Sequence, residues 1–191
     1  IEKYAFSECS LSLLNIPPSV VKICDCAFLN CKNLRKVTFL SNSKLEEIEE
    51  SAFAGTSLKA IEIPSNLIKI GKSAFKDCAK LKVVSFEAGS KLDLIEKLAF
   101  SGSNLEKLHI PSNAVLNEGW YNEIENIKEI IIDENHKKYR FLNNELFLEK
   151  SDINRDVHDV LLFARKDLKK VTIPKYIRRI APFAFQKSRV E

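Results

Sequence analysis

The cysteines are the first residues in this sequence that could carry chemistry. Cys24, Cys26 and Cys31 lie close enough along the chain to suggest a zinc site. Zinc sites usually combine Cys-x2-Cys pairs with a fourth ligand, and the first histidine of the chain is His109. A total of five cysteines also excludes a fully disulfide-paired framework. We therefore expect free thiols, with disulfides and a metal site as less favoured alternatives.

Two histidines near carboxylates form a second candidate. His136 and His158 have four acidic neighbours in sequence: Asp133, Glu134, Asp156 and Asp159. A carboxylate–histidine pair can take part in acid–base catalysis, but here no serine or cysteine nucleophile with motif context accompanies it. The chain also has no glycine-rich phosphate loop. We predict no enzymatic activity, no catalytic residue, no cofactor and no metal; an enzyme hidden in residues 136–160 is the alternative.

A third candidate is a series of basic residues that follow the first Leu or Ile of successive apolar blocks. They are Arg35, Lys59, Lys82, Lys128 and Lys169, while Ser12 and Glu106 hold the same place in two further blocks. Residues 165–191 contain nine basic and two acidic residues, including Lys170, Arg178 and Arg179. We predict that these eight basic residues bind an acidic protein or a sulfated glycan. An ordinary solvated surface is the alternative, and a net charge of +4 is too small to imply a nucleic-acid partner.

The elements that position these residues follow from an internal repeat. The dipeptide Ala-Phe occurs six times, with an Ile five residues before each Phe and Cys, Thr or Ser three residues after it. The six Phe residues are Phe6, Phe28, Phe53, Phe75, Phe100 and Phe185. Between them recurs the pattern Leu-x-x-apolar-x-apolar, which is typical of a short strand with one buried face. Its seventh copy is Leu168, Val171 and Ile173.

Such a repeat predicts a solenoid. A unit of about 23 residues cannot bury its own apolar side chains, whereas stacked units bury them against their neighbours. We therefore expect an α/β repeat solenoid with a parallel sheet, a short helical turn at each Ala-Phe, and a continuous stack of the first five Phe rings. Cys9, Cys31 and Cys78 share the small-residue slot with Thr56 and Ser103, so we expect them to be reduced, buried and slow to react.

The pattern resembles the BspA-like class of leucine-rich repeat. The copy that carries the resemblance runs Leu58-x-x-Ile61-x-Ile63-Pro64-x-x-Leu67-x-x-Ile70-Gly71-x-x-Ala74-Phe75-x-x-Cys78. The stretch from Asp159 to Pro174 is similar to the trichomonad branch of the family. Members of this family are surface antigens, so the resemblance implies adhesion to host or bacterial surfaces. The repeat spacing alone predicts only a scaffold for protein interactions.

The repeat is interrupted twice after Phe100. Where the next Ala-Phe is due the chain reads Gly119-Trp120-Tyr121, so we expect Trp120 or Tyr121 to fill the Phe position. Residues 133–164 exceed one repeat and contain alternating runs around Asn143-Asn144, which predicts an inserted β-hairpin that projects from the coil. We predict one leucine-rich repeat domain over residues 1–191, as a fragment of a longer array.

These observations lead to a functional hypothesis. We expect a non-enzymatic adhesion protein of the cell surface or extracellular space, with a host cell-surface protein, a matrix protein or an acidic glycan as its partner. The alternative is an intracellular, cytoplasmic interaction scaffold of the same fold. No apolar run approaches the roughly 20 residues that a membrane span needs.

Overall fold

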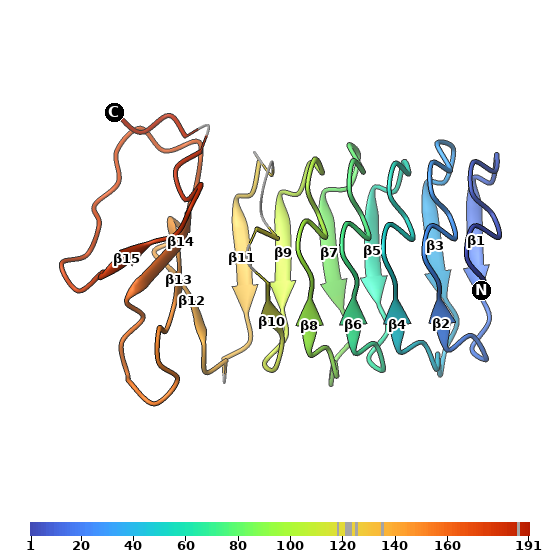
Figure 1. The fold of residues 1–191 in the computed structure, drawn as a ribbon, viewed down its shortest axis with the longest axis horizontal. Helices are drawn as coiled ribbons and strands as arrows, with labels where there is room; N and C mark the ends of the chain where they lie inside the picture. Colours follow the sequence, from blue (N-terminus) through green and yellow to red (C-terminus); the bar gives the residue numbers. More distant parts are fainter. Residues whose placement is uncertain (118, 121–123, 125, 135, 187) are drawn as a thin grey trace.

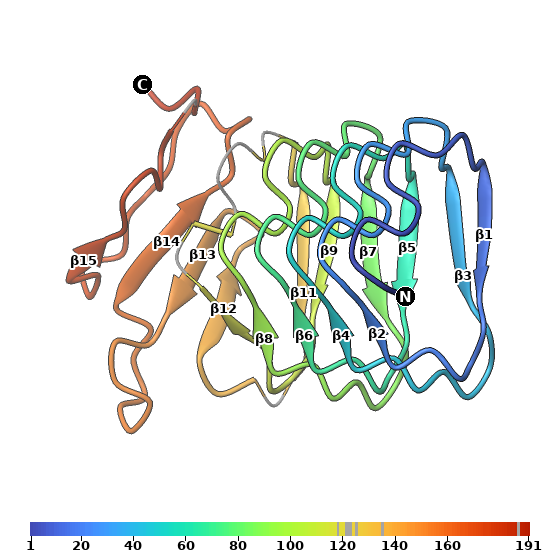
Figure 2. The ribbon, with the colours of Figure 1, turned by 45° about the vertical axis from the view of Figure 1, so that its right-hand side comes forward.

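Two ladders of parallel strands run along the molecule (Figure 1). The computed structural model describes all residues except 118, 121–123, 125, 135 and 187. The four-residue strands β1 (Leu13–Ile16), β3 (Lys36–Phe39), β5 (Ala60–Ile63), β7 (Val83–Phe86), β9 (Lys107–Ile110) and β11 (Glu129–Ile132) form one side of the coil. The two-residue strands β2 (Lys22–Ile23), β4 (Glu47–Ile48), β6 (Lys69–Ile70), β8 (Leu94–Ile95) and β10 (Val115–Leu116) form another (Figure 2). The molecule is therefore a β-solenoid of leucine-rich repeats.

Equivalent residues of successive coils lie side by side in these ladders. In the long strands Ile61 pairs with Val84, and Val84 pairs with Leu108. The long strands are hydrogen-bonded in two groups, β1–β3 and β5–β7–β9–β11, and β3 also contacts β5. A constant offset in sequence thus becomes a line in space, as expected for a solenoid.

The Ala-Phe segments are turns, and among the described residues no helix occurs. The expected helical turns, and with them the α/β class, are wrong. Two residues of each of the first five turns have a left-handed backbone, for example Cys26 (φ 56°) and Asn30 (φ 57°), and this conformation interrupts an α-helix. Backbone N–H groups between them bond to the next coil: Phe28 N donates to Ala52 O at 2.8 Å. The segments are thus a third edge at which coils are joined.

The core is a column of repeated side chains. Phe6, Phe28, Phe53, Phe75 and Phe100 stack with ring centroids 5.1 to 5.6 Å apart and nearly parallel planes. The four inner rings of this column are fully buried, whereas Phe6 at its end is 39% exposed. The predicted aromatic stack is therefore confirmed.

A second kind of sheet follows the last coil. It consists of β12 (Tyr139–Leu142), β13 (Leu146–Glu149), β14 (Val160–Ala164) and β15 (Arg179–Ile180). The first three strands are antiparallel neighbours, and β15 pairs in parallel with β14. Asn143 and Asn144 form the tight turn between β12 and β13, both with positive φ, as their sequence predicts.

The central strands of this sheet, β13 and β14, are buried on both faces, and the sheet packs against the coil instead of projecting from it. Tyr139, Phe147 and Phe163 belong to the main core, where Phe147 packs edge-on against Trp120 at 5.9 Å. Leu146, Leu148 and Leu161 form a second core with Ala164 and Ala184. The projecting hairpin was expected because the sequence shows the alternation of the strands but not which coil covers them. A single domain over 1–191 with an insertion at 133–164 stays a prediction.

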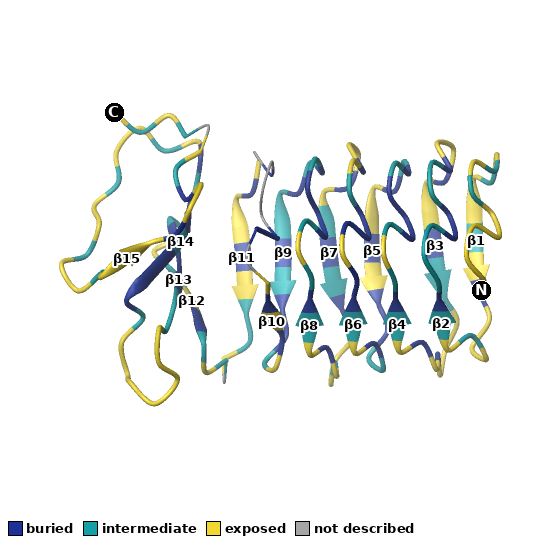
Figure 3. Ribbon diagram, in the orientation of Figure 1, coloured by how far each residue is buried: buried dark blue, intermediate teal, exposed yellow. Residues whose placement is uncertain are grey.

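The last predicted strand block is not a strand. Residues 168–173 have no strand pairing, and Ile173 is 39% exposed. β14 instead supplies the strand beside β15. Figure 3 shows the largely exposed chain around β15, in contrast to the buried strands β13 and β14.

Candidate functional site

The basic residues of the first six blocks form one row at the start of the long strands. Arg35 N donates to Ser12 O, Lys82 N to Lys59 O, Glu106 N to Lys82 O, and Lys128 N to Glu106 O, each at 2.9 Å. The side chains of Arg35, Lys59, Lys82 and Lys128 are exposed. We call this set, Arg35, Lys59, Lys82, Glu106 and Lys128, the charged row.

The two halves of the charged row differ in free positive charge. Glu106 forms ion pairs with Lys82 at 2.7 Å and with Lys128 at 3.2 Å. Hydrogen bonds from these two ammonium groups lower the pKa of Glu106, so it stays ionised. Among the described residues, Arg35, Lys59 and the neighbouring Lys36 have no acidic partner. The cations without an acidic partner therefore lie at the start of β3 and β5, while Glu106 offsets one of the two lysine charges beside it.

The remaining predicted binding residues do not continue this row. β12 takes the place beside β11 where the next coil was expected. Lys169 and Lys170 lie in the segment without strand pairing that follows β14, and Arg178 and Arg179 lie at β15. All four are exposed, but the full length of the solenoid body separates β15 from β3 (Figure 1).

The thiols are positioned by the coil next to them. Cys31 Sγ donates to Phe6 O at 2.9 Å and Cys78 Sγ donates to Phe53 O at 3.1 Å. In these two coils the small-residue slot thus holds a donor that reaches the Phe carbonyl of an adjacent coil, whereas Ser103 Oγ in the same slot is buried without a hydrogen-bond partner among the described residues. Burial raises the pKa of Cys78 to about 11. All five cysteines are free, and Cys9 is only half-buried, contrary to expectation, because it lies in the end coil.

The closest carboxylate–histidine pair differs from the predicted one. His109 Nε2 lies 2.6 Å from Asp133 Oδ1, and Asp133 Oδ2 accepts bonds from Ser112 N and Oγ at 3.1 and 3.0 Å. Burial alone would raise the pKa of Asp133, but the bonds from His109 and Ser112 outweigh it and lower that pKa. The signal in the sequence is the spacing of 24 residues, one repeat, between His109 and Asp133. Ser112 bonds to the carboxylate rather than to the imidazole, so this arrangement joins two coils and does not activate a nucleophile.

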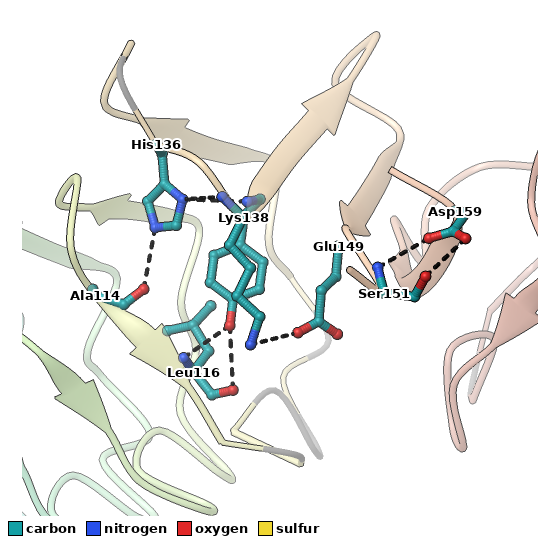
Figure 4. A network of polar contacts seen from close by, with 8 residues as sticks. Ala114, Leu116, His136, Lys138, Glu149, Ser151 and Asp159 are labelled. Atoms are coloured by element: carbon teal, nitrogen blue, oxygen red, sulfur yellow. Dashed lines mark hydrogen bonds and ion pairs between the residues drawn. The ribbon is translucent and has the colours of Figure 1, made fainter. Parts of the chain in front are cut away.

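His136 is held at the junction between the solenoid and the second sheet (Figure 4). Its Nδ1 accepts bonds from the backbone N–H groups of Lys138 and Tyr139, at 3.1 and 3.2 Å. Its Nε2 donates to Ala114 O at 3.1 Å, which fixes the neutral tautomer. Both ring nitrogens are thus engaged in structure. His158 lies separately, near Arg140 and Lys150, and burial lowers its pKa.

Tyr139 closes the ladder of short strands at this junction. Its hydroxyl accepts a bond from Leu116 N at 3.0 Å and lies 3.5 Å from Leu116 O. These atoms belong to β10, the last short strand of the solenoid body. Trp120, predicted for the Phe position, takes the Ala position instead: Trp120 N bonds to Asn117 O as Ala99 N bonds to Glu96 O. Tyr121 lies outside the described residues.

Two further polar pairs hold this junction, and His158 Nε2 nearby is buried without a hydrogen-bond partner among the described residues. Lys138 Nζ lies 2.7 Å from Glu149 Oε1, and Asp159 accepts bonds from Ser151 N and Oγ at 2.9 Å each. Within the part of the chain that the structure describes, no group of three or more His, Cys, Asp or Glu residues could hold a metal ion. The largest group of exposed cations without an acidic partner among the described residues of the strand ladders is therefore at the charged row, formed by Arg35, Lys36 and Lys59.

The repeat geometry agrees with a known family. The model of the BspA type leucine-rich repeat region matches residues 1–128, 46–161 and 158–191, in six copies. The chain belongs to this family. Among curated proteins, none matches this sequence significantly.

Three solved structures resemble this member of the BspA-type family. The pneumococcal vaccine antigen PcpA is 29% identical with a TM-score of 0.85, over 94% of this chain and 43% of PcpA. A leucine-rich cell surface protein from Faecalibacterium prausnitzii is 19% identical with a TM-score of 0.69, over 98% of this chain and 62% of that protein. A leucine-rich repeat protein from Eubacterium ventriosum is 17% identical with a TM-score of 0.61, over 82% and 46%.

The chain thus spans about half the length of these relatives, and the last two show the fold alone. All three relatives are bacterial, and the trichomonad branch stays a prediction. In the described residues no helix is long and apolar enough to cross a membrane.

Proposed function

We propose that this protein is a non-enzymatic adhesion module of a cell surface, and that the long-strand face around Arg35, Lys36 and Lys59 binds the ligand. The observation that carries the proposal is the unequal charge of the row. Glu106 offsets one of the two positive charges of Lys82 and Lys128 and is ion-paired with both, whereas the three cations at the start of β3 and β5 are exposed and free of acidic partners among the described residues.

The chemistry of this patch suits a ligand with several negative charges. Each exposed ion pair contributes little, so binding requires several simultaneous contacts. A sulfated glycan or an acidic matrix protein offers such contacts at regular intervals. The names of two relatives, a vaccine antigen and a cell surface protein, support the cell-surface location. A second basic region, at the far side of the second sheet, contains Lys169, Lys170, Arg178 and Arg179. Only a ligand long enough to extend past the second sheet could contact both this region and the patch around Arg35.

The test compares two double variants with equal change in charge. Arg35→Glu/Lys59→Glu should reduce binding to immobilised heparin, or to an acidic matrix protein, at least tenfold. Lys82→Glu/Lys128→Glu should reduce it less, because in the wild type both lysines are ion-paired with Glu106, which offsets one of their two charges. Lys91→Glu/Lys97→Glu, two exposed lysines outside the long strands and outside the charged row, controls for net charge.

Binding should also weaken as salt increases, because exposed charges are screened within about 10 Å at 0.1 M. Equal binding by all three folded double variants would overturn the assignment of the surface. Binding to heparin but not to the matrix protein, or the reverse, identifies the class of ligand. A chain that functions as a cytoplasmic scaffold would bind neither, and that result would overturn the proposal of adhesion.

A further inference from the structure

The ladder of short strands contains a gap at the second sheet. β10 is the last member of the five-stranded ladder, and β15 holds the equivalent place in the final repeat but pairs with β14. Between them lies a cavity of about 290 Å³. Its apolar lining is formed by Val115, Leu116, Trp120, Leu162, Ala181 and Pro182. The replacement of a coil by β12–β14 thus causes both the interruption of the ladder and the cavity.

The edge of β10 beside this cavity is closed to an added strand. The backbone N–H of Leu116 is taken by the Tyr139 hydroxyl at 3.0 Å, and the carbonyl oxygen lies 3.5 Å from the same group. Peptides that extend a sheet need these backbone groups free. Side chains rather than backbone groups therefore recognise a ligand in this cavity. The cavity volume is near the lower end of the usual range for ligand sites, so the ligand must be small.

The charged groups of the lining favour an anion. Lys138 and Glu149 form an ion pair at 2.7 Å and balance each other. Burial alone would lower the pKa of Lys138, but its bond to Glu149 outweighs burial and raises that pKa, so the pair stays ionised. Arg179, the third charged group of the lining, is exposed and has no acidic partner in the described part of the chain. A guanidinium binds a carboxylate through two parallel hydrogen bonds.

We propose that the cavity between β10 and β15 binds a small apolar carboxylate, whose body packs against Trp120, Val115 and Leu162 and whose carboxylate pairs with Arg179. The site is separate from the charged row and does not depend on the adhesion proposed above. An aryl or short branched acyl group matches the apolar side chains of the lining, because it packs against them without adding a polar atom that they would leave unsatisfied. The polar part of the lining is formed by Asn117, Lys138, Glu149 and Arg179.

The single tryptophan of the chain gives a direct readout, since Trp120 lines the cavity. Phenylacetate, titrated into the whole chain, should change the tryptophan emission saturably in the millimolar range or below. Phenylacetamide has the same body without the charge and should bind at least tenfold more weakly. Acetate has the charge without the body and should produce no saturable change.

Two variants test the lining itself. Arg179→Gln should weaken phenylacetate binding at least tenfold. The matched control Arg178→Gln should leave binding within about twofold, because Arg178 does not line the cavity and lies 4.0 Å from Asp159. Ala181→Phe should fill the cavity and abolish binding, and thermal melts report whether each variant is folded.

Three results would overturn the proposal: no saturable response of the wild type to phenylacetate, equal affinity for phenylacetamide, or unchanged binding by folded Arg179→Gln. The first is confirmed or refuted independently by isothermal titration calorimetry. None of these outcomes bears on heparin binding by the charged row.

Discussion

The solenoid body and the sheet β12–β15 are stabilised in different ways. In the body, each position makes the same contact in every coil: the inner Phe rings stack on one another, and equivalent residues pair in the ladders. At the second sheet, each contact joins residues of different types and occurs only once in the described part of the molecule. His136 bonds to Ala114, Tyr139 to Leu116, and Phe147 packs on Trp120. Loss of one residue should therefore affect the body through its neighbours and the junction through a single contact.

The largest effect is expected in the body. Phe53→Ala or Phe75→Ala should lower the free energy of unfolding by about 3–5 kcal/mol, because each deletes a fully buried ring with a stacked partner on both sides. Phe6→Ala is the matched control, since Phe6 has one stacked partner and is 39% exposed. Chemical denaturation measures all three. A loss below about 1 kcal/mol for the inner rings would contradict their role as core.

An intermediate effect is expected at the junction. Tyr139→Phe keeps the ring and removes the hydroxyl that accepts the bond from Leu116 N. A buried N–H left without a partner costs about 1–3 kcal/mol. Hydrogen exchange should show faster exchange of the Leu116 amide, with the amides of β4 and β6 unchanged. Uniformly faster exchange along the whole body would contradict the local character of this junction.

A smaller effect should follow from pH. Burial lowers the pKa of His136 below the ordinary value of 6.5. The positive charge of Lys138 also lowers this pKa, whereas the hydrogen bond to Ala114 and the negative charge of Asp133 raise it by less. The unfolded chain thus binds more protons than the folded one as pH falls below about 6.5, so stability is present above that pH and declines as pH falls through the lower folded pKa. Denaturation midpoints at pH 7.5 and 5.5 measure this decline.

The variant His136→Gln isolates this contribution. A glutamine amide can still accept and donate hydrogen bonds but does not titrate, so the difference between the two pH values should become smaller than in the wild type. An unchanged difference would mean that other groups, such as His158, cause the decline.

The smallest effect is expected for the chemical modification of single thiols. Cys31 and Cys78 should react slowly with a thiol reagent in the native protein, because burial raises the pKa of both and blocks access. Cys9, half-buried in the end coil, should react faster. Five thiols should titrate after denaturation without reductant. A count of one free thiol would reveal two disulfides.

The same contrast explains what could be predicted from the sequence. The Phe column, the strand blocks through Ile132 and the small-residue slot were predictable because the residue pattern behind each of them recurs in several repeats of the sequence. The turns at Ala-Phe were not, since a left-handed residue at Cys26 or Ser51 has no signature in side-chain type. The position of each cation in the charged row was predictable, but its pairing with Glu106 depends on side-chain distances that the repeat offset does not specify.

The junction was beyond prediction for a further reason. Trp120 stands in an Ala position, and its burial depends on Phe147, 27 residues later, in strands that have no counterpart in the repeat. The pairing of β14 with β15 likewise replaced the expected strand at 168–173, because β14 is a largely buried strand and the segment 168–173 is not.

The two buried faces of β13 and β14 have a consequence for how such arrays change length during evolution. Adding or deleting a coil inside a uniform solenoid shifts every later unit along one continuous column. Here the column of Phe rings ends before this sheet, and Leu146, Leu148 and Leu161 begin another with Ala184. The main core and this second core share no buried residue, so a change in the number of coils in the solenoid body leaves the contacts of the second core unaltered.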